Sequence, residues 1–164
     1  MKTFDLAAAK RQAYRLLAMR PHSEGELERR LRDKGFPDGV IKEALEKLHE
    51  LKYLNDASFA VQWARNAAVN KLWGNRKISA GLQEKGVAER LIADAIAAVR
   101  EEWSEEEAIA AFLRKKTPGT KEKLLNRKER QRIFASLIRR GFPPGLIDNQ
   151  LGTFAEDDID GEDG

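Results

Sequence analysis

A pattern built around glycine recurs three times along this chain of 164 residues. Counted from Gly35, Gly86 and Gly141, apolar residues stand at −8, −4, +1, +5, +6 and +10 each time, and a basic residue directly precedes each glycine. The glycines are 51 and 55 residues apart. Self-similarity with such a period is typical of proteins that stack one small supersecondary unit several times. This repeat constrains the fold more than any other feature.

The spacing within each repeat predicts two amphipathic helices joined at the glycine. Apolar residues four apart, such as Leu27 and Leu31, lie on one face of a helix. A glycine just after the last of them can adopt the left-handed conformation that closes a helix. Each segment also has room for a helix before this pair. Because such small units cannot bury their apolar faces alone, we expect neighbouring repeats to stack.

We therefore predict an all-α protein of three tandem three-helix, helix-turn-helix-like repeats, stacked into an elongated, curved array. No run of residues has the alternation typical of a strand. The repeats are expected at 1–56, 57–103 and 104–154, followed by an acidic, disordered tail at 155–164. The helices are expected at 5–19, 24–34, 38–51, 57–72, 76–85, 88–102, 105–116, 127–140 and 144–152.

Several of these helices carry a start signal. Ser23-x-x-Glu26 and Ser104-x-x-Glu107 have the spacing of a capping box, in which side chains satisfy free N–H groups at the helix start. The residues expected to act as single N-caps are Asp56, Asn75 and Asn126.

Charge is distributed unevenly along the chain. The net charge is only +3, but residues 155–164 hold six acidic groups, and residues 114–140 hold eleven basic residues against two acidic ones. The basic segment suggests a polyanion or an acidic protein surface as partner, although a solvated helix face is the alternative. The tail is interpreted either as a solubilising end or as an internal gate that competes for the basic segment. Its deletion would then tighten DNA binding at low salt.

Composition argues against several other classes of protein. The chain has no cysteine, and His22 and His49 have no spaced metal-ligand partner, so both are expected to be ordinary polar surface residues. Glycine-rich phosphate loops, nucleophile elbows and His-Glu-x-x-His are absent from the sequence. We expect a cytoplasmic, non-enzymatic protein with no cofactor, no metal and no membrane segment.

Four motifs follow one another in a fixed order and spacing. They are Leu16-Leu17-Ala18-x-Arg20-x-His22-Ser23-x-x-Glu26-Leu27, Lys34-Gly35-Phe36, Tyr53-Leu54-Asn55-Asp56-x-x-Phe59-Ala60 and Gly74-x-x-x-Ile78-x-x-x-Leu82-x-x-Lys85-Gly86. With these motifs, the chain resembles the RecX family of RecA regulators over roughly residues 13–152. The third repeat departs most, since Arg140 replaces lysine before its glycine and the linker at 117–126 is longer and very basic.

The resemblance implies a protein that binds RecA, alone and as a filament on DNA, and that restrains strand exchange, ATP hydrolysis and stimulated repressor cleavage. We expect the protein to be a monomer. Contact with single- and double-stranded DNA is expected to be weak and independent of sequence. A direct DNA-binding protein that competes with RecA for DNA is the first alternative, and an inert docking scaffold is the second.

Basic residues are the candidates for contact with the filament or with nucleic acid. For Lys34, Lys85 and Arg140, an equally good interpretation is that a cation stabilises the C-terminal end of a helix. Trp73 lies among basic residues and is interpreted as a stacking platform or, more commonly, as packing between helices. The candidate residues are Lys34, Lys71, Arg76, Lys77, Lys85, Arg114, Lys115, Lys116, Lys121, Lys123, Arg127, Lys128, Arg130, Arg132, Arg139 and Arg140.

Overall fold

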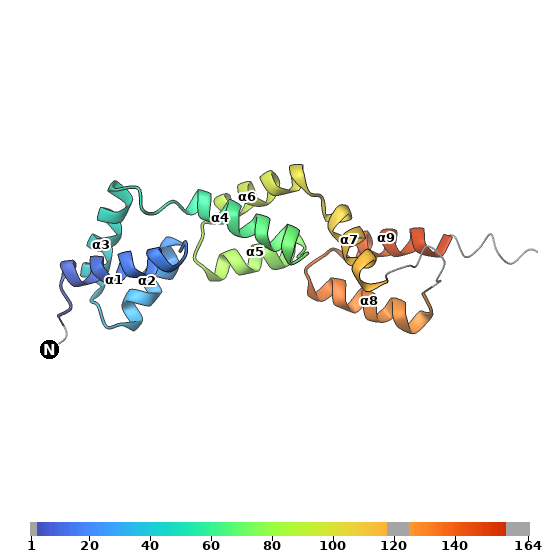
Figure 1. Cartoon of the computed structure of the whole chain (residues 1–164), viewed down its shortest axis with the longest axis horizontal. Coiled ribbons are helices and arrows are strands. Elements are labelled where there is room, and N and C mark those ends of the chain that lie inside the picture. The colour runs from blue at the N-terminus through green and yellow to red at the C-terminus, as the bar shows by residue number, and fades with distance from the viewer. Residues whose placement is uncertain (1–2, 118–124, 157–164) are drawn as a thin grey trace, which may run out of the picture. The chain divides into compact units, whose positions relative to one another are not determined.

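The computed structural model describes residues 3–117 and 125–156, and these residues contain nine α-helices and no strand (Figure 1). This confirms the predicted all-α class. The helices are α1 (Leu6–Met19), α2 (Glu24–Asp33), α3 (Asp38–Glu50), α4 (Asp56–Arg65), α5 (Asn75–Glu84), α6 (Glu89–Glu102), α7 (Glu105–Lys116), α8 (Arg127–Arg139) and α9 (Pro144–Glu156).

Two helices end differently from the sequence-based expectation. The helix expected at 57–72 continues after α4 only as a π-helix, η1 (Asn66–Asn70). Leu72 then takes a left-handed conformation with φ of 54°, and the N–H of Trp73 reaches back to the carbonyl of Ala67. At the other end of the chain, α9 extends to Glu156 rather than 152, and the tail beyond it lies outside the described residues.

The three repeat glycines close helices as predicted. Gly35, Gly86 and Gly141 have φ of 103°, 74° and 93°, which is the left-handed region. In the first repeat, the N–H of Phe36 bonds to the carbonyl of Leu31, so the chain folds back onto the helix that it has just left. The same bond forms in the other repeats, and the apolar residue after the glycine is buried in all three.

The cap predictions are confirmed in part. Ser23 and Glu26 form a reciprocal capping box, and Asn126 forms another with Glu129. The Ser104 side chain accepts a hydrogen bond from the N–H of Glu107. These three helix starts are therefore fixed by local sequence.

Two single N-cap predictions are wrong. Asp56 is the first residue of α4, where the side chain of Asn55 accepts from the N–H of Ser58 instead. Asn75 is the first residue of α5, after Gly74, and its side chain accepts from Arg100. Both side chains bond instead to distant parts of the chain. Asn75 accepts from Arg100, and Asp56 accepts from the N–H of Glu24.

The interpretation of His22 as a surface residue is also wrong. His22 is only 5% exposed, and its Nδ1 lies 2.9 Å from the carbonyl oxygen of Arg20. Burial lowers the pKa of His22 because it disfavours the charged ring. His49 is exposed, as expected, and contacts Glu24.

The chain forms two compact units, each with its own apolar core. Unit 1 comprises Met1–Trp63 and Gly81–Ala95, and unit 2 comprises Ala64–Ala80 and Ile96–Gly164. The core of unit 1 gathers the apolar faces of α1, α2 and α3. The core of unit 2 gathers those of α7, α8 and α9 and also buries Leu72. Burial of these faces is the main stabilising contribution within the first and third repeats.

Candidate functional site

Within unit 1, the start of α2 packs against the turn that follows α5. We call this contact the first joint, made by Ser23, Gly25 and Glu26 on one side and Lys85 and Gly86 on the other. The Ser23 hydroxyl donates to the carbonyl oxygen of Lys85, which is one of the carbonyls left free at the end of α5. A Cβ on Gly25 would stand 2.6 Å from that carbonyl oxygen. Glycine is therefore required at this approach.

The first joint contains a carboxylate, that of Glu26, whose side chain is 11% exposed. Its carboxylate accepts from Arg20 at 2.7 Å and lies 3.5 Å from the Lys85 Nζ. Burial alone would raise the pKa of Glu26, but hydrogen bonds from Arg20 and from the Ser23 N–H, together with the charge of Lys85, lower it. Lys85 is therefore engaged in a structural ion pair.

Within unit 2, the start of α5 packs in a similar way against the turn that follows α8. This second joint joins Gly74, Arg76 and Lys77 to Arg140 and Gly141. The N–H of Gly74 donates to the carbonyl oxygen of Arg140 at 2.7 Å, and the N–H of Arg76 donates to that of Gly141 at 3.2 Å. A Cβ on Gly74 would collide with the carbonyl group of Gly141. Free N–H groups at one helix start thus satisfy carbonyls at another helix end.

The two joints differ in charge at one equivalent position. Glu26 and Lys77 each stand nine residues before the repeat glycine that follows them. The second joint therefore has a lysine where the first has its carboxylate. Arg140, which corresponds to Lys85, instead donates to the carbonyl oxygen of Lys71 and lies 4.7 Å from the centre of the Phe112 ring.

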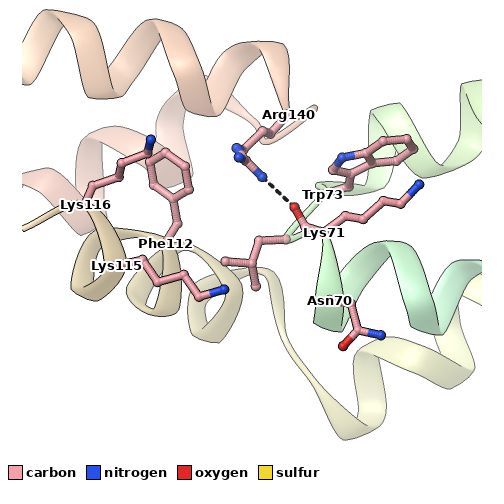
Figure 2. Close-up of a pocket in the computed structure, with 8 residues that line it drawn as sticks. Asn70, Lys71, Trp73, Phe112, Lys115, Lys116 and Arg140 are labelled. Atoms are coloured by element: carbon pink, nitrogen blue, oxygen red, sulfur yellow. Dashed lines mark hydrogen bonds between the residues drawn. The ribbon is translucent and has the colours of Figure 1, made fainter.

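Beside the second joint is a cavity of about 480 Å³ within unit 2, which we call the basic pocket. Lysine and arginine side chains approach it from the end of η1, the end of α7 and the turn after α8 (Figure 2). Phe112 and Leu72, which are 2% and 4% exposed, give it an apolar wall. The lining residues are Asn70, Lys71, Leu72, Trp73, Phe112, Lys115, Lys116 and Arg140.

Cations cover the aromatic rings of this region. The Nζ atoms of Lys71 and Lys77 lie 4.8 Å and 4.3 Å from the centre of the Trp73 ring, and that of Lys116 lies 5.8 Å from the centre of Phe112. These are distances at which an aromatic face attracts a cation. Trp73 therefore holds lysines beside the pocket, in keeping with a packing role.

Arg100 on α6 fixes the backbone next to the pocket. Its guanidinium donates to the Asn75 side chain at 2.7 Å, to the Trp73 carbonyl at 2.9 Å and to the Trp103 carbonyl at 3.1 Å. Burial lowers the pKa of Arg100, and the nearby charges of Glu105 and Glu106 partly oppose this. Arg100 therefore has a structural role that the sequence did not reveal.

The structure brings together only part of the predicted set. Lys71, Lys115, Lys116 and Arg140 line the pocket, with Lys77 next to it. Lys34, an exposed C-cap of α2, and Lys85, at the first joint, belong to unit 1. The exposed candidates elsewhere in unit 2 are Arg76, Arg114, Arg127, Lys128, Arg132 and Arg139.

The three remaining candidates are not exposed residues of the described structure. Arg130 is half-buried, and its Nε has no hydrogen-bond partner among the described residues. Lys121 and Lys123 lie outside the described residues. Whether any candidate contacts a partner stays a prediction.

The basic residues at 114–140 differ from several elsewhere in the chain in their pairing. Arg20, Arg32 and Lys85 in unit 1 and Arg65 in unit 2 form ion pairs with carboxylates. Within the described part of residues 114–140, no basic side chain forms an ion pair with another described residue. These side chains are therefore not held by carboxylates of the described chain.

Sequence reasoning did not select Asn70, Leu72 or Phe112 as site residues. Phe112 follows the apolar period of α7 and looks like any core residue, so nothing local indicates that Arg140 lies over it. A signal for the site did exist in the sequence, because alignment of the repeats shows lysine at 77 where the first repeat has Glu26.

Comparison with known proteins gives three consecutive matches along the chain. Models described as the first, second and third three-helix domains of RecX match residues 9–48, 55–96 and 104–150. The chain belongs to the RecX family. The resemblance stated from the sequence motifs is thereby confirmed, as is the architecture of three tandem three-helix repeats.

Relatives across the RecX family are named regulatory protein RecX. The one from Mycolicibacterium smegmatis is 33% identical, over 82% of this chain and 72% of the relative. The one from Geobacillus kaustophilus is 34% identical over 87% of this chain, which spans only 52% of that relative's length. These names give this RecX-family chain a regulatory role.

Solved RecX structures share the fold. The crystal structure of RecX from Lactobacillus salivarius has a TM-score of 0.76 and 22% identity, covering 93% of this chain and 97% of the other. A second structure, titled regulatory protein RecX, has a TM-score of 0.71 and 22% identity over 87% of this chain and 70% of the other. At this level of identity the likeness concerns the fold. In the part of the RecX-family chain that the structure describes, no helix combines the length and apolar content needed to cross a bilayer.

Proposed function

We propose that this chain is a non-enzymatic regulator that binds RecA and the RecA–DNA filament and inhibits recombinase, ATPase and co-protease activities. Family membership supports the regulatory role. The observation that carries the proposal further is the cluster of lysine and arginine side chains around the basic pocket, which is lined by no carboxylate and suits a target made of DNA and protein. Electrostatic attraction of this kind speeds association and depends strongly on salt.

A direct DNA-binding protein is the second candidate function. It would inhibit RecA only by occupying DNA, and the same basic residues support it. The two functions differ in dose, because competition requires enough protein to cover the DNA.

The deciding experiment measures RecA ATPase on single-stranded DNA while the chain is titrated at fixed, saturating RecA. A filament-directed regulator inhibits well below one molecule per RecA. Inhibition that begins only when the chain is sufficient to coat the DNA supports competition. No inhibition at any dose contradicts both functions and favours a docking scaffold.

A second experiment tests the surface. Reversing charge at Lys115, Lys116, Arg127 and Lys128 to glutamate is expected to weaken filament binding and to flatten its dependence on salt. The matched control reverses four exposed basic residues of unit 1, with the same change in net charge: Arg11, Arg15, Lys42 and Arg90. Equal weakening by both variants would mean that only net charge matters.

A further inference from the structure

We propose that the basic pocket of unit 2 binds a backbone phosphate of a nucleic-acid strand. The inference rests on the proposed function for its biological setting and deepens it by naming the site and the chemical group. The pocket is lined by Lys71, Lys115, Lys116 and Arg140 and by no carboxylate. Lysine ammonium groups bind phosphate as point charges, and arginine adds directional N–H donors.

Helix ends around the pocket do not cancel its charge. η1 ends at Asn70, α7 ends at Lys116 and the C-cap of α8 is Arg140, so three C-terminal ends meet near the pocket. Each such end carries about −0.5 of an elementary charge. Four cations contribute about +4 against about −1.5 from the helix ends, which leaves a clear positive excess. Stabilisation of helix ends therefore explains only part of the cluster.

The excess has a specific origin in the repeat. In the first joint, Glu26 accepts from Arg20 and lies near Lys85, so the joint has its own counter-charge. In the second joint, the equivalent residue is Lys77, which lies against Trp73 and adds to the positive charge. Glu105 accepts from the N–H of Asn75 at the start of α5, but no carboxylate lines the pocket itself, which leaves the pocket open to an anion.

Two observations favour a nucleic-acid phosphate over the carboxylates of an acidic protein. Further exposed basic residues stand on the same two helices that contribute to the pocket, at Arg114 on α7 and at Arg127, Lys128 and Arg132 on α8. Several exposed cations on α7 and α8 suit a ligand with regularly repeated charge. The pocket also has an apolar wall of Leu72 and Phe112, which suits the sugar and base that accompany each phosphate.

The test measures binding without RecA, so it can fail independently of the proposed inhibition. Fluorescence anisotropy of a labelled oligothymidine strand is followed at several salt concentrations for the full chain and for Lys115→Gln/Lys116→Gln. These neutral substitutions avoid placing acid at the end of α7. We expect at least a tenfold weaker affinity and a salt slope shallower by about 1.4, since each lost contact on a single strand accounts for about 0.7.

Controls and alternatives are included in the same assay. Lys42→Gln/Arg90→Gln removes the same charge from exposed positions of unit 1 and should leave the slope unchanged. Lys115→Arg/Lys116→Arg keeps both charges and should retain the salt slope of the natural chain. Measurements with labelled duplex DNA show whether the phosphate belongs to a single strand or to a duplex. A change of slope in the glutamine variant on either kind of DNA supports the site.

Three outcomes would overturn the inference. The first two are an unchanged slope in the glutamine variant and an equal change in the unit 1 control. If polyglutamate instead binds the pocket more tightly than either nucleic acid, an acidic protein surface is the ligand and the phosphate assignment is wrong. Helical circular dichroism of each variant verifies that it is folded.

Discussion

The two joints share a backbone arrangement but differ in charge at one equivalent position. In each, the start of one repeat's middle helix satisfies a carbonyl at the glycine turn of the next repeat, through Ser23 in unit 1 and Gly74 in unit 2. In the first, the Glu26 carboxylate lies between Arg20 and Lys85, whereas in the second the equivalent residue is Lys77, which lies over Trp73. The difference teaches that a repeat interface can keep its backbone contacts while the charge of one side chain changes.

The largest expected effect comes from breaking the shared geometry. Gly74→Ala places a Cβ against the carbonyl group of Gly141, and Gly25→Ala places one 2.6 Å from the Lys85 oxygen. Backbone cannot yield as a flexible side chain does, so each change should lower the free energy of unfolding by about 1–3 kcal/mol or more. Urea unfolding of both variants measures this.

Gly39→Ala and Gly145→Ala are the matched controls, because a Cβ at either position meets no atom within 4 Å. Alanine in these helices should stabilise by roughly 0.5–1 kcal/mol. If the joint variants also gain stability, the close approach of the helix ends is wrong.

The next effect comes from giving the first joint the charge of the second. Glu26→Lys breaks the capping box, removes the acceptor of Arg20 and places two cations beside each other at Lys85. Loss of charge-assisted hydrogen bonds at a mostly buried site should cost about 2 kcal/mol, seen as a lower urea midpoint. Glu28→Lys, at an exposed ion pair, provides the comparison and should cost well under about 1 kcal/mol.

The reverse exchange gives the second joint the charge of the first. Lys77→Glu places a carboxylate near Arg140 and should change stability by no more than about 1 kcal/mol, because such pairs contribute little when partly exposed. Its larger consequence should be weaker binding of oligothymidine, measured by anisotropy. Tighter binding would mean that the positive charge of this joint does not serve an anion.

The smallest effect is a difference in pH dependence. The pKa of folded Glu26 is below the ordinary 4.5, so the unfolded chain takes up its proton first. Stability from Glu26 is therefore fully present above pH 4.5 and is lost as pH falls through the lower folded pKa. Urea unfolding across this range should show a steeper loss for the natural chain than for Glu26→Gln.

Asp56 provides an internal comparison for that measurement. Burial raises its pKa above 3.8, although the Glu24 N–H opposes the shift, so its contribution has the opposite sign. Because Asp56 is present in both the natural chain and Glu26→Gln, its contribution to the pH dependence cancels when the two are compared. Identical pH profiles would mean that the first joint does not hold the Glu26 carboxylate as described.

Local sequence determined the helices and most of their ends. Apolar spacing around Gly35, Gly86 and Gly141 predicted the helix pairs, and Ser23 and Asn126 predicted helix starts, because each of these signals acts within a few residues of the chain. Repetition of the same signals also predicted the three-repeat architecture and the family. The curvature of the array stays a prediction.

Tertiary structure alone decided which cations converge. Lys71, Lys115 and Arg140 are far apart along the chain and carry no local mark that distinguishes them from other surface lysines and arginines. Their meeting depends on the packing of helix ends at the second joint. In unit 1, tertiary packing likewise lets Asp56 accept from the N–H of Glu24 while Asn55 caps α4. Charge acts through space, so the sequence could supply the positive residues but only the fold could place them around one pocket.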